Sequence, residues 1–276
     1  MRPVRGQNQG SVQKCDGVIA HAETFSKRAD VERDIGVIRL QHIGEGERDE
    51  RGQTFSGLKR RVALFHERIE AGRVIAFIQQ FLEIFDMHPM LARNIAFYHP
   101  DLQGPIDVAE MIWGSDIFYA FYDDTELLRD FLKLITDTYI LFMKKWFTLV
   151  PQRQDYSTHW GLMFKGKLMI RNDSLMNLSA QAYIDFIRPF DQCLLDEFGG
   201  GAIHFCGRGD HYVEAMSSLR GLTAVNLTQP ELNDMEIIYR NTVDKGIRLV
   251  GLDIKAVENS DRDFRGQVQC FSNKKI

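Results

Sequence analysis

The chain has few cysteines and no long apolar run. Its four cysteines among 276 residues are too few for a disulfide scaffold, and we interpret them as buried thiols or metal ligands. The longest apolar-rich stretch, residues 139–150, is broken by Lys144 and Lys145, so the sequence predicts no membrane span. Residues 1–17 lack the apolar segment of a signal peptide, and we therefore expect a cytoplasmic protein.

The chain also lacks an excess of positive charge. Its 34 Lys and Arg residues face 38 Asp and Glu residues, giving a formal net charge of −4. This balance argues against bulk attraction to nucleic acid or to an anionic membrane. The sequence contains no Walker A motif, no Gly-x-Ser-x-Gly elbow and no dinucleotide-binding glycine fingerprint. We expect a small-molecule substrate, with neither nucleic acid nor membrane as a partner.

Residues 1–54 differ in composition from the rest of the chain. They contain a single aromatic side chain, Phe25, and a glycine-interrupted run of alternating charge over residues 44–52. Such a composition cannot bury much apolar surface. It predicts an irregular, poorly ordered N-terminal segment, followed by one domain over residues 55–276.

Hydrophobic periodicity beyond residue 55 predicts strands that alternate with helices. The expected helices cover residues 57–71, 108–113, 124–147, 180–198, 212–219 and 231–245. The expected strands cover residues 74–78, 95–99, 160–164, 168–171, 202–206, 223–227, 247–252 and 268–271. Short strands rich in Val and Ile, separated by helices, are typical of parallel sheets. Up to eight strands favour an α/β fold of the (β/α)8 TIM-barrel type, with a doubly wound open sheet as the alternative.

Polar side chains follow several of these strands, at the end where barrel enzymes carry their chemistry. Asp101, Asp173 and His211 are the candidate catalytic acids and bases. The candidate substrate-binding residues offer amide groups at the same strand ends, and they are Gln103, Asn226 and Gln229. For any one of these residues a purely structural role, such as a helix cap, is the competing interpretation.

The segment His204-Phe-Cys206 carries the most specific spacing. On a strand, residues two apart point to the same side, so the imidazole and the sulfur converge. Imidazole and thiolate are ligands that suit Zn²⁺, and Cys270 on the last predicted strand could supply a third. Three protein ligands would leave one open position, as in catalytic zinc sites. The alternative is a pair of packed core residues.

Several segments resemble the uroporphyrinogen decarboxylase superfamily. They are DLQGPIDVAEMIWG at residues 101–114, YDDTE at 122–126 (with Thr125 where proline is usual), NDS at 172–174, LS at 178–179, RPF at 188–190 and, most strongly, GGAIHFCGR at 200–208. The resemblance covers roughly residues 72–276 and implies a (β/α)8 barrel. The cobalamin-dependent methyltransferases of this superfamily bind zinc through a His-x-Cys pair and a later cysteine. By resemblance these positions are His204, Cys206 and Cys270.

The resemblance implies zinc-dependent methyl transfer between a corrinoid and a thiol acceptor, with the corrinoid on a separate protein. The alternative activity is decarboxylation of a tetrapyrrole acid, as in porphyrin biosynthesis, without metal. True uroporphyrinogen decarboxylases carry an Arg-Gln-Ala-Gly-Arg signature that this sequence lacks. A third hypothesis is a barrel that binds a ligand without catalysis.

Overall fold

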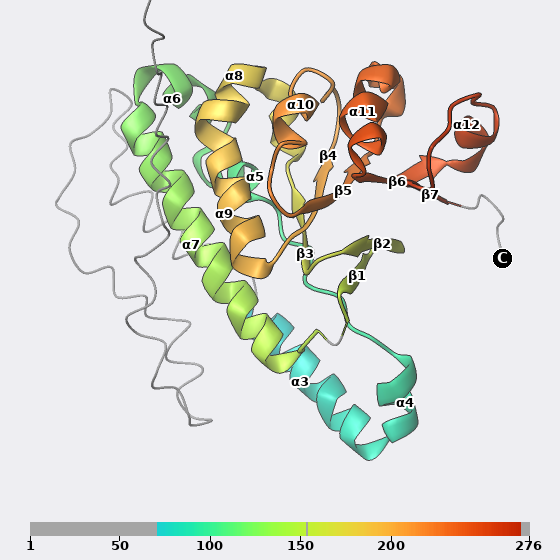
Figure 1. Ribbon diagram of the computed structural model, residues 1–276. Helices are drawn as coiled ribbons and strands as arrows, with labels where there is room; N and C mark the ends of the chain where they lie inside the picture. The colour runs from blue at the N-terminus through green and yellow to red at the C-terminus, as the bar shows by residue number, and fades with distance from the viewer. Residues whose placement is uncertain (1–70, 153, 272–276) are drawn as a thin grey trace, which may run out of the picture.

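The fold is an open, five-stranded parallel sheet with helices on one face and a β-hairpin on the other (Figure 1). The computed structural model describes residues 71–152 and 154–271. The strands lie side by side in chain order, and they are β3 (Leu168–Arg171), β4 (Gly201–Phe205), β5 (Leu222–Leu227), β6 (Arg248–Asp253) and β7 (Val268–Phe271). All four neighbouring pairs are parallel.

The predicted (β/α)8 barrel is wrong. In the part of the chain that the structure describes, β3 and β7 are the two edges of the parallel sheet, so the sheet does not close. Residues 74–78 lie in helix α3 (Ala71–Met87), and residues 95–99 form no strand. Residues 160–164 contribute to an antiparallel hairpin. Since this hairpin covers the second face of the sheet, the fold is not the doubly wound alternative either.

Residues 74–78 were predicted as a strand but form part of helix α3, and the reason is physical. The segment Val-Ile-Ala-Phe-Ile is rich in the branched and aromatic residues that strands favour. Its buried positions, Ile75 and Ile78, are however three residues apart, and the partly buried Leu82 follows four residues later. That spacing places all three side chains on one helical face.

Helices bury the outer face of the sheet. Leu168 and Ile170 of β3 pack in one core with side chains from α5 (Pro105–Trp113), α7 (Thr125–Leu149) and α9 (Arg188–Phe198). The shorter helices and turns are α4 (Pro89–Asn94), α6 (Ile117–Asp123), η2 (Asp173–Asn177), α8 (Ala180–Ala182), η3 (Tyr183–Ile187), α10 (Val213–Met216), η4 (Pro230–Leu232), α11 (Met235–Asn241), η5 (Val243–Lys245) and α12 (Ile254–Glu258).

Two of the predicted helices are confirmed, and three others are interrupted or shorter than predicted. The helix expected at 124–147 is confirmed as α7, and the Asp124 side chain accepts a hydrogen bond from the Leu127 N–H at 3.1 Å, as an N-cap does. The helix expected at 108–113 is confirmed as α5. The one at 180–198 is interrupted by the π-turn η3, and those at 212–219 and 231–245 are shorter than predicted. The helix at 57–71 lies outside the described residues except for Ala71.

A tight hairpin covers the inner face of the sheet. Strands β1 (Tyr156–His159) and β2 (Leu162–Lys165) pair antiparallel around the two residues Trp160 and Gly161. Both residues have positive φ, 51° and 79°, as a two-residue type I′ turn requires. Side chains of β2 pack on alternate residues of the parallel strands, a small core of Leu162, Phe164, Met169, Ala202, Ala224 and Val250. The hairpin therefore covers the side chains of the parallel sheet that point away from the helices.

The β3 edge of the sheet is covered by the preceding chain. His99 Nε2 accepts a hydrogen bond from the Met169 N–H at 3.0 Å, and the Gly104 N–H donates to the Arg171 carbonyl at 2.6 Å. Gln103 forms an isolated parallel bridge with Arg171. Although residues 95–99 are not a strand, the chain that follows them runs beside β3 and brings Asp101 and Gln103 to its carboxyl end.

A buried carboxyl group on α9 supports this end of the sheet. Asp191 is fully buried, and its carboxylate accepts hydrogen bonds from Asn172 Nδ2 at 3.0 Å and from the Tyr183 hydroxyl at 3.2 Å. Burial raises the pKa of Asp191 to about 7, although both hydrogen bonds oppose the shift. The carboxyl group is therefore protonated in the folded protein under mildly acidic conditions.

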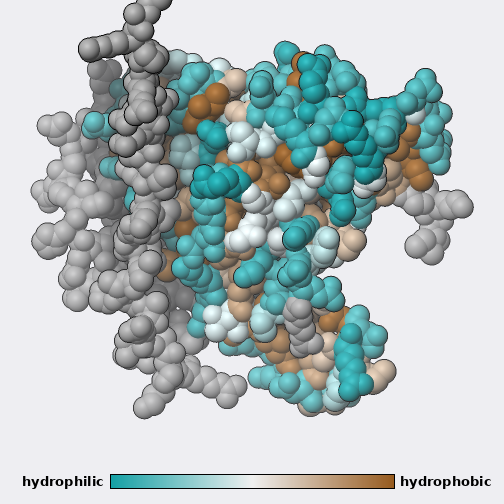
Figure 2. Space-filling model, viewed as in Figure 1, coloured by the Kyte–Doolittle hydropathy of each residue, from teal (hydrophilic) through white to brown (hydrophobic). Residues whose placement is uncertain are grey.

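Apolar side chains are exposed where helices α3 and α4 project from the body of the molecule (Figures 1 and 2). Met87 and Met90 are 67% and 66% exposed, and Ile95 is 47% exposed.

Within the described residues, no helix combines the length and the apolar composition that crossing a membrane demands.

Gly166 is expected to be essential for the way the hairpin joins β3. It has φ +108°, and a Cβ there would lie 2.5 Å from backbone atoms of Gly200 and Gly201. Gly166→Ala should lower the free energy of unfolding by about 2 kcal/mol, because it adds this backbone overlap to the cost of a positive φ. Urea unfolding measures the loss. The control is Gly199→Ala, whose Cβ at φ +74° meets nothing within 4 Å; an equal loss in the two variants would contradict the prediction.

Candidate metal centre

The polar residues at the carboxyl end of the sheet form one row across neighbouring strands. Arg171 of β3 is the register partner of His204 on β4, and His204 is the partner of Asn226 on β5. Asn226 is in turn the partner of Val250 on β6. Because the strands are parallel and in this register, the side chains of Arg171, His204 and Asn226 lie on the same face, beneath the hairpin.

Three potential metal ligands meet beside this row. His204 is buried, while Asp173 and Cys206 are partly exposed. Nε2 of His204 lies 3.1 Å from Oδ1 of Asp173 and 3.4 Å from Sγ of Cys206. One ligand atom from each of the three residues lies within 4.8 Å of the other two. This Asp173–His204–Cys206 cluster could hold a metal ion.

Local structure explains how each ligand reaches the cluster. His204 is the penultimate residue of β4, and Cys206 follows the strand directly, so both project from the same face. Asp173 is the first residue of η2, the turn that follows β3. Gln229 holds the loop after β4, since its Oε1 accepts a hydrogen bond from the Gly207 N–H at 2.6 Å. The cluster therefore draws on two adjacent strand ends.

The structure does not bring Cys270 to the His204–Cys206 pair. Cys270 lies on β7, at the opposite edge from β3, and β5 and β6 separate it from β4. Strands in a sheet lie about 4.8 Å apart, so three strand spacings place its backbone about 14 Å away. The third potential ligand beside the pair is Asp173, which the sequence analysis treated as a catalytic acid or base.

The charge of Asp173 is stabilised by its neighbours. Burial alone would raise its pKa, but hydrogen bonds from His204 and Cys206, and the nearby charges of His204 and Arg171, lower the pKa to about 2. One Arg171 nitrogen lies 3.3 Å from this carboxylate. Burial raises the pKa of the Cys206 thiol, and the neighbouring Asp173 carboxylate adds to the increase. Without a cation, the cluster therefore favours a carboxylate beside a protonated thiol.

Asp101 ties the hairpin to the row. Its carboxylate accepts hydrogen bonds from Arg171 at 2.8 Å, from His159 Nε2 at 3.2 Å and from Trp160 Nε1 at 3.2 Å. Burial opposes ionisation here, yet the contacts with Arg171 and His159 lower the pKa of Asp101. The Trp160 ring stands edge-on to the His204 ring, with centroids 5.0 Å apart. The Arg171 guanidinium lies over the face of the Trp160 ring, with its carbon 4.8 Å from the ring centroid.

Three residues of the site, Arg171, His159 and Trp160, were not predicted from the sequence. Arg171 had a usable signal, because its position two residues before Asp173 ends a predicted strand. Trp160 had no such signal in the sequence, because a bulky residue with positive φ is uncommon in a turn. In addition, residues 160–164 were predicted as one strand and not as part of a hairpin.

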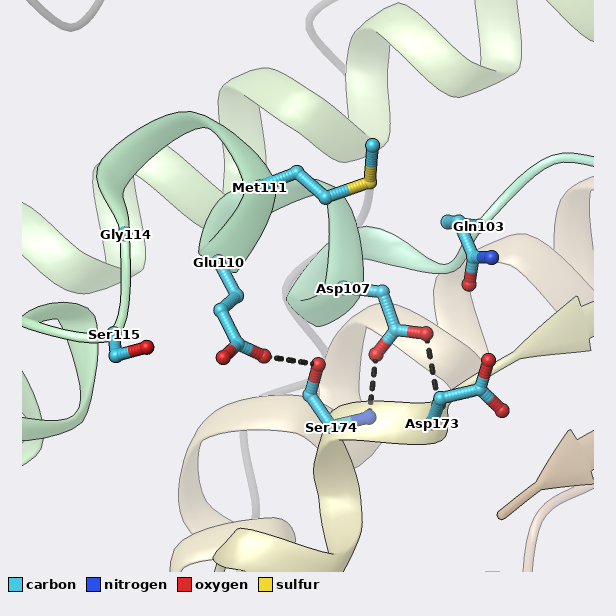
Figure 3. Close-up of a pocket in the computed structure, with 8 residues that line it drawn as sticks. All are labelled: Gln103, Asp107, Glu110, Met111, Gly114, Ser115, Asp173 and Ser174. Atoms are coloured by element: carbon cyan, nitrogen blue, oxygen red, sulfur yellow. Dashed lines mark hydrogen bonds between the residues drawn. The ribbon is translucent and has the colours of Figure 1, made fainter.

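A polar cleft of about 400 Å³ lies beside the cluster and shares Asp173 with it (Figure 3). Asp107 lines the cleft, and its two oxygens accept hydrogen bonds from the N–H groups of Asp173 (2.7 Å) and Ser174 (2.8 Å). The Ser174 hydroxyl donates to Glu110 at 2.6 Å. Burial raises the pKa of Asp107 to about 6 against these hydrogen bonds. Gln103, a predicted substrate-binding residue, also lines the cleft.

The remaining predicted site residue, His211, has a structural contact. Its Nε2 lies 2.9 Å from the Leu178 carbonyl oxygen, with which it forms a hydrogen bond. This bond joins the loop after β4 to the end of η2. His211 is not part of the three-residue cluster, and it does not line the cleft.

Comparison with known proteins adds no relative. A scan of protein-family models, a search of curated proteins and a search of solved structures each found no match to this chain.

Proposed function

We propose that this protein is a zinc-dependent enzyme that transfers a methyl group between a corrinoid and a thiol acceptor. The observation that carries the proposal is the Asp173–His204–Cys206 cluster beside a polar cleft. The corrinoid would be carried by a separate protein. The resemblance of the 200–208 segment to cobalamin-dependent methyltransferases supports the choice of reaction.

The chemistry and spacing of the donors suit zinc. Zinc in proteins accepts imidazole nitrogen, thiolate and carboxylate oxygen together. Its bond lengths of about 2.0–2.3 Å at a tetrahedral angle place two donors about 3.3–3.6 Å apart. The His204 donor lies 3.1 Å from the Asp173 oxygen and 3.4 Å from the Cys206 sulfur, close to that range before any metal has drawn the ligands into place.

The contacts of each residue suggest its role in the proposed reaction. Asp173, His204 and Cys206 would hold the ion and leave one position for a substrate. When bound, zinc would lower the pKa of a substrate thiol, which would release its proton to solvent. The thiolate could then attack the methyl group of a methyl-corrinoid, and the demethylated corrinoid would leave with the electron pair of the broken bond. Arg171 adds to the interactions with His204 and Cys206 that keep Asp173 ionised, and the Trp160 ring packs edge-on against His204. Glu110 and Gln103 line the cleft in which the acceptor would lie.

The cleft favours this reaction over decarboxylation of a tetrapyrrole acid. Asp107, Glu110 and Asp173 contribute carboxyl groups to its lining. A substrate with several carboxylates would meet groups of its own charge there, and like charges at short range repel. A thiol acceptor carries no such penalty.

Two measurements test the proposal on the purified chain. Plasma mass spectrometry should find about one zinc per chain after exposure to zinc and removal of excess metal. A thiol-dependent loss of the methyl group from free methylcobalamin should then require the zinc-loaded protein. Cys270→Ser is the matched control and should retain both properties, because Cys270 lies away from the cluster. A protein that folds but binds no zinc would contradict the proposal, as would a zinc protein without thiol-dependent demethylation.

A further inference from the structure

We propose that Asn226 is a positioning residue that fixes the ring orientation and tautomer of His204, so that Nε2 presents its lone pair to the cluster. Its value to a bound metal rests on the proposed function. The tautomer itself belongs to the metal-free chain and can be measured there. This assignment replaces the substrate-binding role that the sequence suggested for Asn226.

The amide of Asn226 has only one possible orientation. Its Nδ2 lies 2.6 Å from the main-chain carbonyl oxygen of Val250. A carbonyl oxygen can only accept a hydrogen bond, so the amide nitrogen must face it. The amide oxygen of Asn226 therefore faces His204, where it lies 2.5 Å from Nδ1.

This orientation determines where His204 carries its hydrogen. The amide oxygen can only accept, so Nδ1 must donate. In the neutral ring the other nitrogen, Nε2, then has a lone pair and no hydrogen. With the opposite tautomer, two acceptors would face each other at 2.5 Å in a buried site, which is strongly unfavourable.

The freed lone pair points at the other two potential ligands. Nε2 lies 3.1 Å from Asp173 and 3.4 Å from Cys206. A neutral Nε2 without hydrogen and an ionised carboxylate at this distance are two acceptors. Such a pair is stabilised by a cation between them, which is a proton on Nε2 when the His204 ring is charged and would be the metal ion in the loaded site. Metal-bound histidines commonly donate the N–H of their second ring nitrogen to an oxygen in this way, which orients the ring.

The backbone of β6 is shaped to hold the Asn226 amide. The pairing of β6 with β7 is irregular between Val250 and Leu252, and Gly251 has φ +88°. A Cβ on Gly251 would lie 2.6 Å from Asn226 Nδ2. The bulge at Gly251 therefore leaves room for the amide that reaches Val250. Bulges of this kind are frequent beside functional sites.

Nitrogen-15 NMR of the metal-free, full-length protein tests the tautomer directly. The His204 ring signals can be assigned from their loss in His204→Gln, and they should show Nδ1–H and an unprotonated Nε2 at mildly alkaline pH. An Nε2–H tautomer in the wild-type chain would overturn the inference. Because this measurement uses no metal, it stands even if the wild-type protein binds no zinc and the proposed function fails.

Two substitutions at Asn226 test its effect on the metal. Asn226→Leu removes the acceptor and should weaken zinc binding by about 10- to 100-fold in competition with a chelator, as loss of such partners typically does. Asn226→Asp keeps an acceptor for Nδ1 and should keep the Nδ1–H tautomer, although its second oxygen then faces the Val250 carbonyl oxygen at a cost to stability. A leucine variant with wild-type tautomer and affinity would overturn the inference.

A glycine pair covers the case in which Asn226→Leu does not fold. Gly251→Ala places a methyl group against the Asn226 amide, whereas Gly246→Ala has φ +76° and nothing within 4 Å of its Cβ. Both variants bear the cost of a positive φ, but only the first displaces the amide. Gly251→Ala should therefore disturb the His204 tautomer and Gly246→Ala should not. Equal behaviour of the two variants would count against the inference.

Discussion

Replacing Asp173 with asparagine is expected to weaken zinc binding by more than about 100-fold. Loss of a residue that merely supports a ligand costs about 10- to 100-fold, and loss of a ligand costs more. Asparagine keeps the size of Asp173 but removes the charge that Arg171 and His204 stabilise. Cys206→Ser should have an effect of similar size, since it replaces a thiolate with a poor zinc ligand.

Competition of the variants against a chromogenic chelator gives the affinities, and circular dichroism monitors folding. Cys270→Ser is the informative control, because it removes a thiol of the same sheet that lies about three strands from His204. Loss of zinc in Cys270→Ser with retention in Asp173→Asn would reverse the ligand assignment. It would show that Cys270 reaches the pair in solution.

Replacing Asp191 with asparagine is expected to stabilise the protein at alkaline pH. The pKa of Asp191 is raised from its ordinary 3.8 to about 7 in the folded state, above all by burial. Between these two values the folded chain binds more protons than the unfolded chain, so stability falls as the pH rises. From about pH 5 to pH 8 this one group should cost about 2–3 kcal/mol.

Urea unfolding at the two pH values measures this contribution. Asp191→Asn should remove it, so that the variant exceeds the wild type at pH 8 by more than it does at pH 5. Asp196→Asn on the same helix is the control. Asp196 is exposed and paired with Arg220, and its replacement should leave the pH dependence unchanged. A wild-type slope that persists in Asp191→Asn would mean that the Asp191 carboxyl is ionised in the fold at pH 5.

The strands of the parallel sheet could be predicted from sequence, whereas the strands expected before residue 165 were wrong or incomplete. From residue 168 onward, short Val- and Ile-rich runs between polar turns gave strands close to β3, β4, β5, β6 and β7. β3, β4 and β5 are almost wholly buried, so their apolar composition is distinctive, whereas β7 is only partly buried. The run at residues 74–78 has the same composition, but it belongs to a longer helical repeat. The hairpin turn at Trp160 lacks the Asn or Asp that usually marks such turns.

The part of the site that could be predicted is the His204–Cys206 pair, and the prediction came from its spacing along one strand. His204 and Cys206 lie on one strand, where alternation alone brings their side chains together. The choice of Cys270 depended on the closure of a barrel, which a pattern of strands cannot establish. In the open sheet the last strand is the farthest from the first. Arg171, His159 and Asn226 act through partners that lie 22 to 70 residues away, and such contacts leave no trace in local periodicity.

The cross-strand row of Arg171, His204, Asn226 and Val250 has a consequence for the order of events during folding. Its members come from four strands that are separated in the sequence by their connections, and such distant pairings are slow to establish. A slip of one residue between β4 and β5 would turn Asn226 towards the helices and leave His204 without its acceptor. A chain in which β4 and β5 have not paired therefore lacks the acceptor that orients His204. Metal binding in the proposed geometry would therefore follow the pairing of β3, β4 and β5.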